Sequence, residues 1–322
     1  MKAPQFEKLF AQLALLNQPQ RRQVLVALHP AAGLDRVVAL IGEIRSKGRQ
    51  CPDCACDRCH RHGQANDLQR YRCCACGRTF NDLTGTPLAR LRHKGKWLEY
   101  LDTVLDSRTV RSAAKRIGVH RNTTFRWRHR VLDRVKDDRP DHLVGIVEAD
   151  EMFLLESQKG SRKLDRPPRK RGGRAALRGI SHHLDCILVA RDRGGQTIDA
   201  VTGRGALKVA QLVTHLLPKL HAQALLVTDA NTAYPAFARA HGVAHQAVNL
   251  SAGERVRKGD AGAIHVQNVN AYHRRFKEWL AHFHGVASRW LPNYLGWHWA
   301  LDGGRVNSVE QLLRIAFGVI NS

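Results

Sequence analysis

The stretch Leu143-Val-Gly-Ile-Val-Glu-Ala-Asp-Glu-Met-Phe-Leu-Leu155 places acidic residues inside an apolar run. β-Branched residues such as Ile146 and Val147, together with the apolar residues after Met152, predict a buried strand. A carboxylate in such a strand is costly to bury unless a cation or hydrogen-bond donors compensate its charge. The position of Asp150 therefore indicates a functional site.

The chain around this strand alternates between strand and helix patterns. Strand patterns recur at 187–190, 197–201, 224–229 and 243–248, and helical patterns at 206–220, 233–240 and 268–283. From 143 to 285 the order is βββαβαβα, which predicts an α/β fold with a mixed sheet.

A second acid, Asp229, ends the strand pattern ALLVTD. In open α/β sheets, functional sites gather at the carboxyl ends of strands. Two acids on neighbouring strands repel each other unless a divalent cation lies between them. Asp150 and Asp229 are therefore candidate metal ligands, and ordinary strand-end acids are the alternative.

The net charge indicates a polyanionic partner. The 322 residues include 52 Lys and Arg against 28 Asp and Glu, a formal charge of +24. Such an excess favours nucleic acid, because phosphate contacts dominate its binding. We find neither a membrane-spanning apolar stretch nor a signal segment at the start. The expectation is a cytoplasmic protein that works beside DNA.

Seven of the eight cysteines fall between Cys51 and Cys76, which favours metal binding over disulfides. Two Cys-x-x-Cys pairs with eighteen residues between them predict a structural zinc site in a zinc ribbon, with ligands Cys51, Cys54, Cys73 and Cys76. Cys56 and Cys59 form a further pair that could replace the first one.

Residues 109–127 have the spacing of a helix-turn-helix, with a turn at Gly118 and a cationic second helix. Arg121, Asn122 and Arg126 are candidates for base or phosphate contacts. Trp127 is expected in the core. Such motifs also serve purely as packing.

The segment 157–178 carries nine Lys and Arg residues, with Pro and Gly that preclude a regular element. We interpret it as a basic loop inserted between strands, in which Lys170 and Arg171 are candidate DNA contacts; a merely solvated loop is the alternative. Residues 1–48 are expected to be helical, with a break at Pro30. The aromatic-rich tail is expected to pack under the sheet.

Taken together, the motifs CPDC…YRCCACGRTFNDLTGTPL, VEADE, VTDANTAYPAF and IHVQNVNAYHRRFK resemble the insertion sequence 1595 (ISXO-type) family of bacterial transposases. The resemblance covers about Cys51 to Tyr294. It implies an RNase H-like catalytic domain with a DDE/N triad and a downstream lysine. By position, Asp150 and Asp229 match the two Asp residues of the triad.

The family's helix motif His-x-Asn-x-x-Glu matches His265, while Gln267 replaces its Asn and Asn270 stands in place of its Glu. The resemblance makes Asn270 the third ligand and Lys277 the lysine. Helix capping is the alternative for Asn270, and a surface position is the alternative for Lys277. His265 is a candidate for a contact behind the ligands or with DNA. Glu148 and Glu151 could compensate for the missing acid.

The resemblance implies a transposase that binds terminal inverted repeats and target DNA as a homodimer or larger assembly, with two catalytic Mg²⁺ ions beside the structural Zn²⁺. Such a protein would be bacterial and nucleoid-associated. The expected regions are a helical segment (1–48), a zinc ribbon (49–88), a helix-turn-helix (89–140) and the catalytic domain (141–322). The rival readings are a non-catalytic DNA-binding regulator or inactive relic, and a nuclease without strand transfer.

Overall fold

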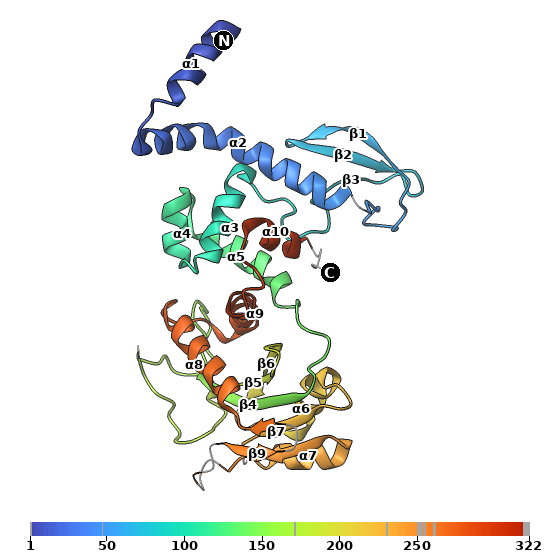
Figure 1. The fold of residues 1–322 in the computed structure, drawn as a ribbon, viewed down its shortest axis with the longest axis vertical. Coiled ribbons are helices and arrows are strands. Elements are labelled where there is room, and N and C mark those ends of the chain that lie inside the picture. The colour runs from blue at the N-terminus through green and yellow to red at the C-terminus, as the bar shows by residue number, and fades with distance from the viewer. Residues whose placement is uncertain are drawn as a thin grey trace. The chain divides into compact units, whose positions relative to one another are not determined.

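The computed structural model describes residues 2–46, 48–170, 172–229, 231–249, 253, 256–259 and 262–317, with the backbone alone at 18, 19, 22, 23 and 25–32. The chain divides into two compact units, 1–127 with 308–322, and 128–307. Figure 1 shows the elements of both. Within the described residues, no helix has both the length and the apolar character needed to cross a membrane.

The first unit begins with helices α1 (Ala3–Leu13) and α2 (Gln18–Ser46). The expected break at Pro30 is wrong, because α2 continues through that position. A proline inside a helix removes one backbone hydrogen bond, and tertiary packing can outweigh that loss. Val37, Ile41 and Ile44 are buried on the later part of α2. At Gly33 a Cβ atom would lie 2.6 Å from the carbonyl oxygen of Gly95, so only glycine allows this close approach.

A small antiparallel sheet follows, in the order β1 (Cys59–Ala65), β2 (Leu68–Cys73), β3 (Thr79–Asn81). Its core contains Tyr71 and Phe80, whose rings lie 5.8 Å apart. The guanidinium of Arg49 lies 4.0 Å from the centre of the Tyr71 ring and also pairs with Asp82. A core of this size needs support beyond apolar burial.

The 3-10 turn η1 (Lys94–Lys96) precedes helices α3 (Trp97–Leu105), α4 (Val110–Ile117) and α5 (Arg121–Val135). Gly118 ends α4 in the left-handed conformation at φ 61°, which glycine adopts without steric cost. Trp127 is buried with its ring edge-on to Tyr100, as expected. The last described helix, α10 (Val309–Ala316), groups with this unit and contacts α3.

The second unit contains a five-stranded mixed sheet in the order β6-β5-β4-β7-β8. Neighbouring strands are antiparallel from β6 to β4 and parallel from β4 to β8. The strands are β4 (Ile146–Leu155), β5 (Leu184–Asp192), β6 (Thr197–Arg204), β7 (Leu225–Thr228) and β8 (Ala244–Ala247). The expected α/β class and mixed sheet are confirmed.

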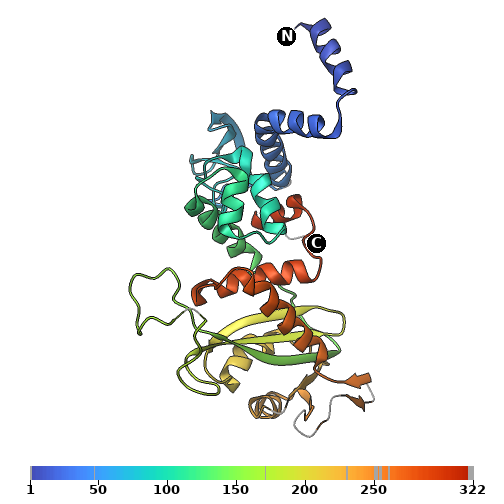
Figure 2. The ribbon, with the colours of Figure 1, turned by 90° about the vertical axis from the view of Figure 1, so that its left-hand side faces the viewer.

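Helices cover both faces of this sheet (Figure 2). One face packs on α6 (Val209–His215) and α7 (Ala233–His241), and the other packs on α8 (Gln267–Ala281) and α9 (Leu291–Asp302). The remaining elements are the 3-10 turns η2 (Leu217–Lys219) and η4 (Ser288–Trp290) and the hairpin β9 (Arg257–Gly259) with β10 (Gly262–Ile264). Because side chains alternate along a strand, Ile146 and Met152 of β4 face α8, whereas Val147 and Ala149 face α6 and α7.

The aromatic tail forms α9 and packs as expected. Trp297, His298 and Trp299 are buried, and the His298 ring lies edge-on to Tyr272 and Phe276 of α8.

His129 stacks on Trp290 with ring centres 3.8 Å apart and hydrogen-bonds to the side chain of Asn293. Burial and the neighbouring cations Arg128 and Arg289 lower the pKa of His129 to about 4. Because the unfolded pKa of about 6.5 is higher, the unfolded state binds the proton first. The stabilising contribution is therefore complete above that pH and is lost as the pH falls toward 4.

Acidification from about pH 7.5 to about pH 5 is expected to lower the free energy of unfolding by about 2 kcal/mol through His129. Urea unfolding followed by tryptophan fluorescence would measure this loss in the wild type and in His129→Gln. The variant should lose about 2 kcal/mol less over the same range. Equal losses in both proteins would contradict the assignment.

Candidate active site and metal centre

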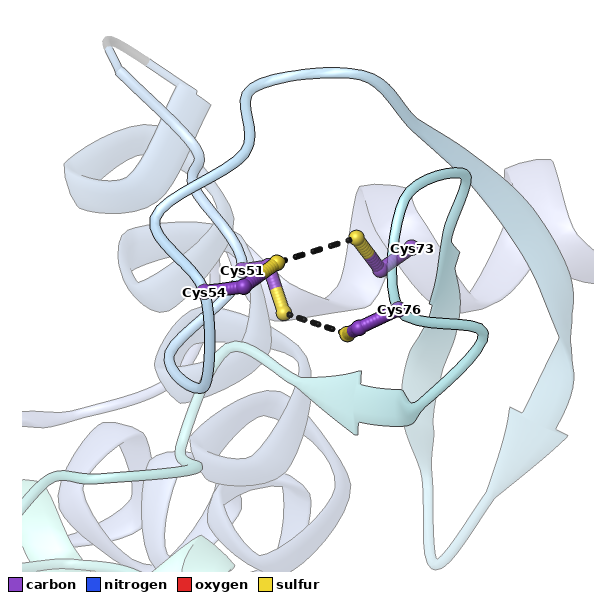
Figure 3. A group of neighbouring side chains, drawn as sticks. All are labelled: Cys51, Cys54, Cys73 and Cys76. Atoms are coloured by element: carbon purple, nitrogen blue, oxygen red, sulfur yellow. Dashed lines mark hydrogen bonds between the residues drawn. The ribbon is translucent and has the colours of Figure 1, made fainter.

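Four cysteines converge from two turns of the first unit (Figure 3). The sulfur atoms of Cys51, Cys54, Cys73 and Cys76 all lie within 4.8 Å of one another. The Cys51–Cys76 and Cys54–Cys73 separations are both 3.6 Å. Four sulfurs about 2.3 Å from a tetrahedral zinc would lie about 3.8 Å apart, so the cluster has the dimensions of a zinc site.

Backbone groups around this cluster favour the binding of a cation. Backbone N–H groups of Cys76 and Ala75 direct hydrogen bonds at the Cys73 sulfur and lower its pKa to about 6, which favours the thiolate that metals bind. Gly77 has a φ of 68°, as the tight turn after the second pair requires. Cys56 and Cys59 lie outside the cluster and direct their thiols at the backbone carbonyls of Arg58 and Cys56. The geometry therefore favours Cys51 and Cys54 as the first pair.

In the second unit, the two candidate acids lie side by side. The parallel pairing of β4 with β7 matches Glu148 to Val227 and Ala149 to Thr228, and the next positions in this register are Asp150 and Asp229. Neighbouring strands lie about 4.8 Å apart. The structure thus brings together two acids that are far apart in the sequence, at the carboxyl end of β7.

Asp150 sits in an environment that disfavours its own charge. Burial, followed by the charges of Asp229 and Glu151, raises its pKa to about 7, and the Lys277 cation partly opposes this rise. A bound divalent cation would reverse the effect, because it compensates both carboxylates at once. The donor set therefore fits a cation that prefers oxygen ligands.

Glu148 lies on the same face of β4 as Asp150 but has a different role. Its side chain is fully buried, and it accepts hydrogen bonds from the backbone N–H groups of Asn268 (2.7 Å) and Val269 (3.1 Å) and from the Asn268 side chain (2.9 Å). These N–H groups belong to the first turn of α8, so the carboxylate caps the helix from another element.

Arg193 compensates the charge of Glu148 at 2.8 Å, and the Nδ1 atom of His265 lies 3.3 Å from the same carboxylate. His265 also contacts Arg193, at 2.7 Å. The Glu148 carboxylate thus anchors the start of α8 to β4 through these contacts. His265 thus lies beside Glu148 and Arg193, just before the first turn of α8.

Helix α8 presents Asn270, His273 and Lys277 on one face, because residues three and four apart align on a helix. Asn270 and Lys277 are exposed, whereas His273 is buried with its Nδ1 atom 3.7 Å from the Asp150 carboxylate. Burial and the Lys277 cation lower the pKa of His273 to about 3, which leaves its imidazole neutral.

Glu151 faces the opposite side of the sheet, where it accepts hydrogen bonds from Tyr234 (3.0 Å) and from Asn231. Asn231 also donates its backbone N–H to Asp229 at 3.0 Å. Glu151 therefore supports the turn that carries Asp229.

The candidate DNA contacts Arg121, Asn122 and Arg126 are exposed on the first turns of α5. Arg128, on the same predicted helix, does not contribute to a cationic surface, because it is fully buried with its guanidinium 4.9 Å from the Trp297 ring centre. Helical spacing alone did not distinguish it from its exposed neighbours.

The basic segment 157–178 is irregular in its described residues, as expected. Arg166 and Arg169 are held by the buried Glu156, at 2.7 and 3.3 Å. Lys170 is exposed, and Arg171 lies outside the described residues.

The sequence patterns did not single out His273, Asn268 or Arg193. Spacing could have revealed His273, which lies three residues after Asn270 and four before Lys277 on the same helix. Nothing local in the sequence connects Arg193 to Glu148.

Comparison with known proteins adds a separate line of evidence. The ISXO2-like transposase domain matches residues 142–297. A Halobacterium salinarum protein described as an uncharacterized protein in transposable element ISH50 is 31% identical over 270 residues, which cover 81% of this chain and 87% of the relative.

Two solved structures show a looser likeness. A pre-cleavage Mos1 transpososome has 13% identity and a TM-score of 0.22, over 65% of this chain and 79% of that chain. The Mos1 strand transfer complex has 15% identity and a TM-score of 0.22, over 67% and 76%. Superpositions this loose carry no structural argument. The domain match and the sequence identity to the ISH50 relative are the informative findings, and they show that the chain belongs to the insertion sequence 1595 family of transposases.

Proposed function

We propose that this chain binds the terminal inverted repeats of its own element, hydrolyses a phosphodiester bond at each end, and joins the freed 3′-hydroxyl to target DNA. The observation that carries the proposal is the lateral pairing of Asp150 with Asp229 on the face covered by α8. Water supplies the oxygen for the first step. In the second step, the 3′-hydroxyl replaces the bridging oxygen of a target phosphodiester and releases a target 3′-hydroxyl.

Asp150, Asp229 and Asn270 would hold Mg²⁺, since carboxylate and amide oxygens are its preferred protein ligands. When bound, two such ions activate the attacking oxygen and stabilise the leaving oxygen of an in-line displacement. Lys277 would hold a DNA phosphate beside the reacting bond. We further propose that this unit is the RNase H-like catalytic domain implied by the family resemblance.

The first unit supplies DNA binding in this proposal. Zn²⁺ bound to the four cysteines would stabilise the zinc ribbon (49–88). The helix-turn-helix within 89–140 would contact the repeats through Arg121, Asn122 and Arg126. Lys170 and Arg171 of the basic segment would add phosphate contacts. Cutting two ends together requires at least a homodimer on DNA.

Cleavage of a labelled transposon-end duplex in the presence of Mg²⁺ tests the proposal. The wild type should nick at the repeat boundary, and Asp229→Ala should reduce the rate about a hundredfold or more while leaving DNA affinity unchanged. Asn270→Glu should bind Mg²⁺ more tightly because it restores a third charge. Salt-sensitive binding without cleavage by any variant would favour the regulator or relic.

A further inference from the structure

We propose that His273 donates an imidazole nitrogen to the metal ion held by Asp150 and Asp229. This inference rests on the proposed function and refines it. The site would then combine two carboxylates with one nitrogen ligand, and Asn270 would complete it from the exposed end of the same helical face.

The position of His273 on α8 suits a metal ligand. His273 lies between Asn270 and Lys277 on the face of α8 that meets Asp150. The His273 side chain is 8% exposed and the Asp150 side chain is 18% exposed, whereas Asn270 is exposed. The imidazole is therefore the group of α8 that lies deepest beside the paired acids.

One ring nitrogen of His273 is unsatisfied. The Nε2 atom of His273 is buried and has no hydrogen-bond partner within the part of the chain that the structure describes. Buried polar atoms are almost always partnered, so an exception requires an explanation. His298 also has an unpartnered buried nitrogen, Nδ1, but its ring packs on Tyr272 and Phe276. The His273 ring instead lies beside the Asp150 carboxylate, where a role as a metal ligand would account for the missing partner.

The other ring nitrogen, Nδ1, lies close to the Asp150 carboxylate. The 3.7 Å between Nδ1 and the Asp150 carboxylate oxygen is too long for a good hydrogen bond. Two ligand atoms about 2.1 to 2.2 Å from one ion, at ordinary coordination angles, lie about 3.0 to 3.6 Å apart. The separation is thus within a few tenths of an ångström of that between two ligands of one ion. Which ring nitrogen faces the ion depends on the ring orientation.

An imidazole ligand changes which metals the site prefers. Mg²⁺ favours oxygen ligands, whereas imidazole suits the transition metals, and affinity for nitrogen-containing sites rises from Mn²⁺ onward. The site should therefore bind Mn²⁺ more tightly than Mg²⁺, and His273 should account for much of the difference.

Electron paramagnetic resonance on the full-length, zinc-loaded protein tests the proposal. Titration with Mn²⁺ gives its affinity, and competition gives the Mg²⁺ affinity. Pulsed measurements detect coupling of bound Mn²⁺ to a ligand nitrogen. The wild type should show nitrogen coupling. His273→Ala and the bulkier His273→Gln should lose the coupling, weaken Mn²⁺ about tenfold or more, and weaken Mg²⁺ much less.

His298→Gln is the matched control, a buried histidine of the same unit whose ring packs on Tyr272 and Phe276. It should keep both the nitrogen coupling and the Mn²⁺ affinity. One outcome would overturn the role of His273 and leave the paired-acid site supported: wild-type Mn²⁺ shows no nitrogen coupling, yet Asp229→Ala releases the ion. Mn²⁺ binding that Asp229→Ala does not weaken would overturn the proposed function itself. The wild-type spectrum decides the question even if the His273 variants do not fold.

Discussion

Replacing Cys73 with serine is expected to abolish zinc binding at the four-cysteine cluster and to unfold residues 49–88. Cys73 is a buried member of the four-cysteine cluster, and its neighbours Tyr71 and Phe80 form only a small core. Structural zinc contributes about 10 kcal/mol or more of apparent binding free energy, which in so small a domain is folding free energy. Metal analysis should find about one zinc per wild-type chain and almost none in Cys73→Ser.

Cys74→Ser provides a matched control, because Cys74 is the adjacent residue and is exposed outside the cluster. It should retain zinc and resist proteolysis between 49 and 88 as the wild type does, whereas Cys73→Ser should be cleaved there rapidly. A zinc chelator should reproduce the Cys73→Ser pattern. Equal protease resistance of the two variants would show that the cluster does not stabilise residues 49–88.

Replacing Glu148 with alanine is expected to lower the free energy of unfolding of the second unit by roughly 3 to 5 kcal/mol. The change leaves Arg193 without its anion and leaves the first N–H groups of α8 without an acceptor. Because α8 carries Asn270 and Lys277, cleavage of the transposon end should also decrease. Glu148→Gln keeps an oxygen acceptor and should fall between the alanine variant and the wild type in both measurements.

Glu278→Ala controls for the loss of a carboxylate on α8. Glu278 is exposed and pairs with Arg274 one turn away, and exposed helical pairs of this kind contribute about 0.3 to 0.5 kcal/mol. Its urea unfolding curve should therefore lie close to that of the wild type. If Glu148→Ala unfolds at the same urea concentration as Glu278→Ala, then the carboxylate does not anchor the helix.

The sequence predicted the elements of the second unit well, because its patterns are local. Alternation of apolar residues identified β4, and three- and four-residue spacing identified α8. The continuation of α2 through Pro30 could not be predicted, because it depends on packing against residues such as Gly95, far along the chain. The buried position of Arg128 and the grouping of α10 with the first unit depend in the same way on distant contacts.

The residues of the candidate site also fall into those that local patterns identify and those that only the fold brings together. The motif spacing identified Asp150, Asp229 and the four cysteines, and the structure brings each set together. The anchoring of α8 was missed because Glu148, Arg193 and Asn268 come from three separate segments. Their association follows from the sheet register and from no local pattern.

The alternation of side chains along β4 also limits which insertions and deletions this strand can accept. Adding or removing one codon upstream in this strand would exchange its two faces, sending Glu148 and Asp150 toward α7 and Glu151 toward α8. The irregular segment 157–178 carries no such restriction, because surface loops tolerate changes in length. Relatives of this chain with a competent site are therefore expected to vary in length within that loop and to keep one fixed length from Ile146 to Glu151.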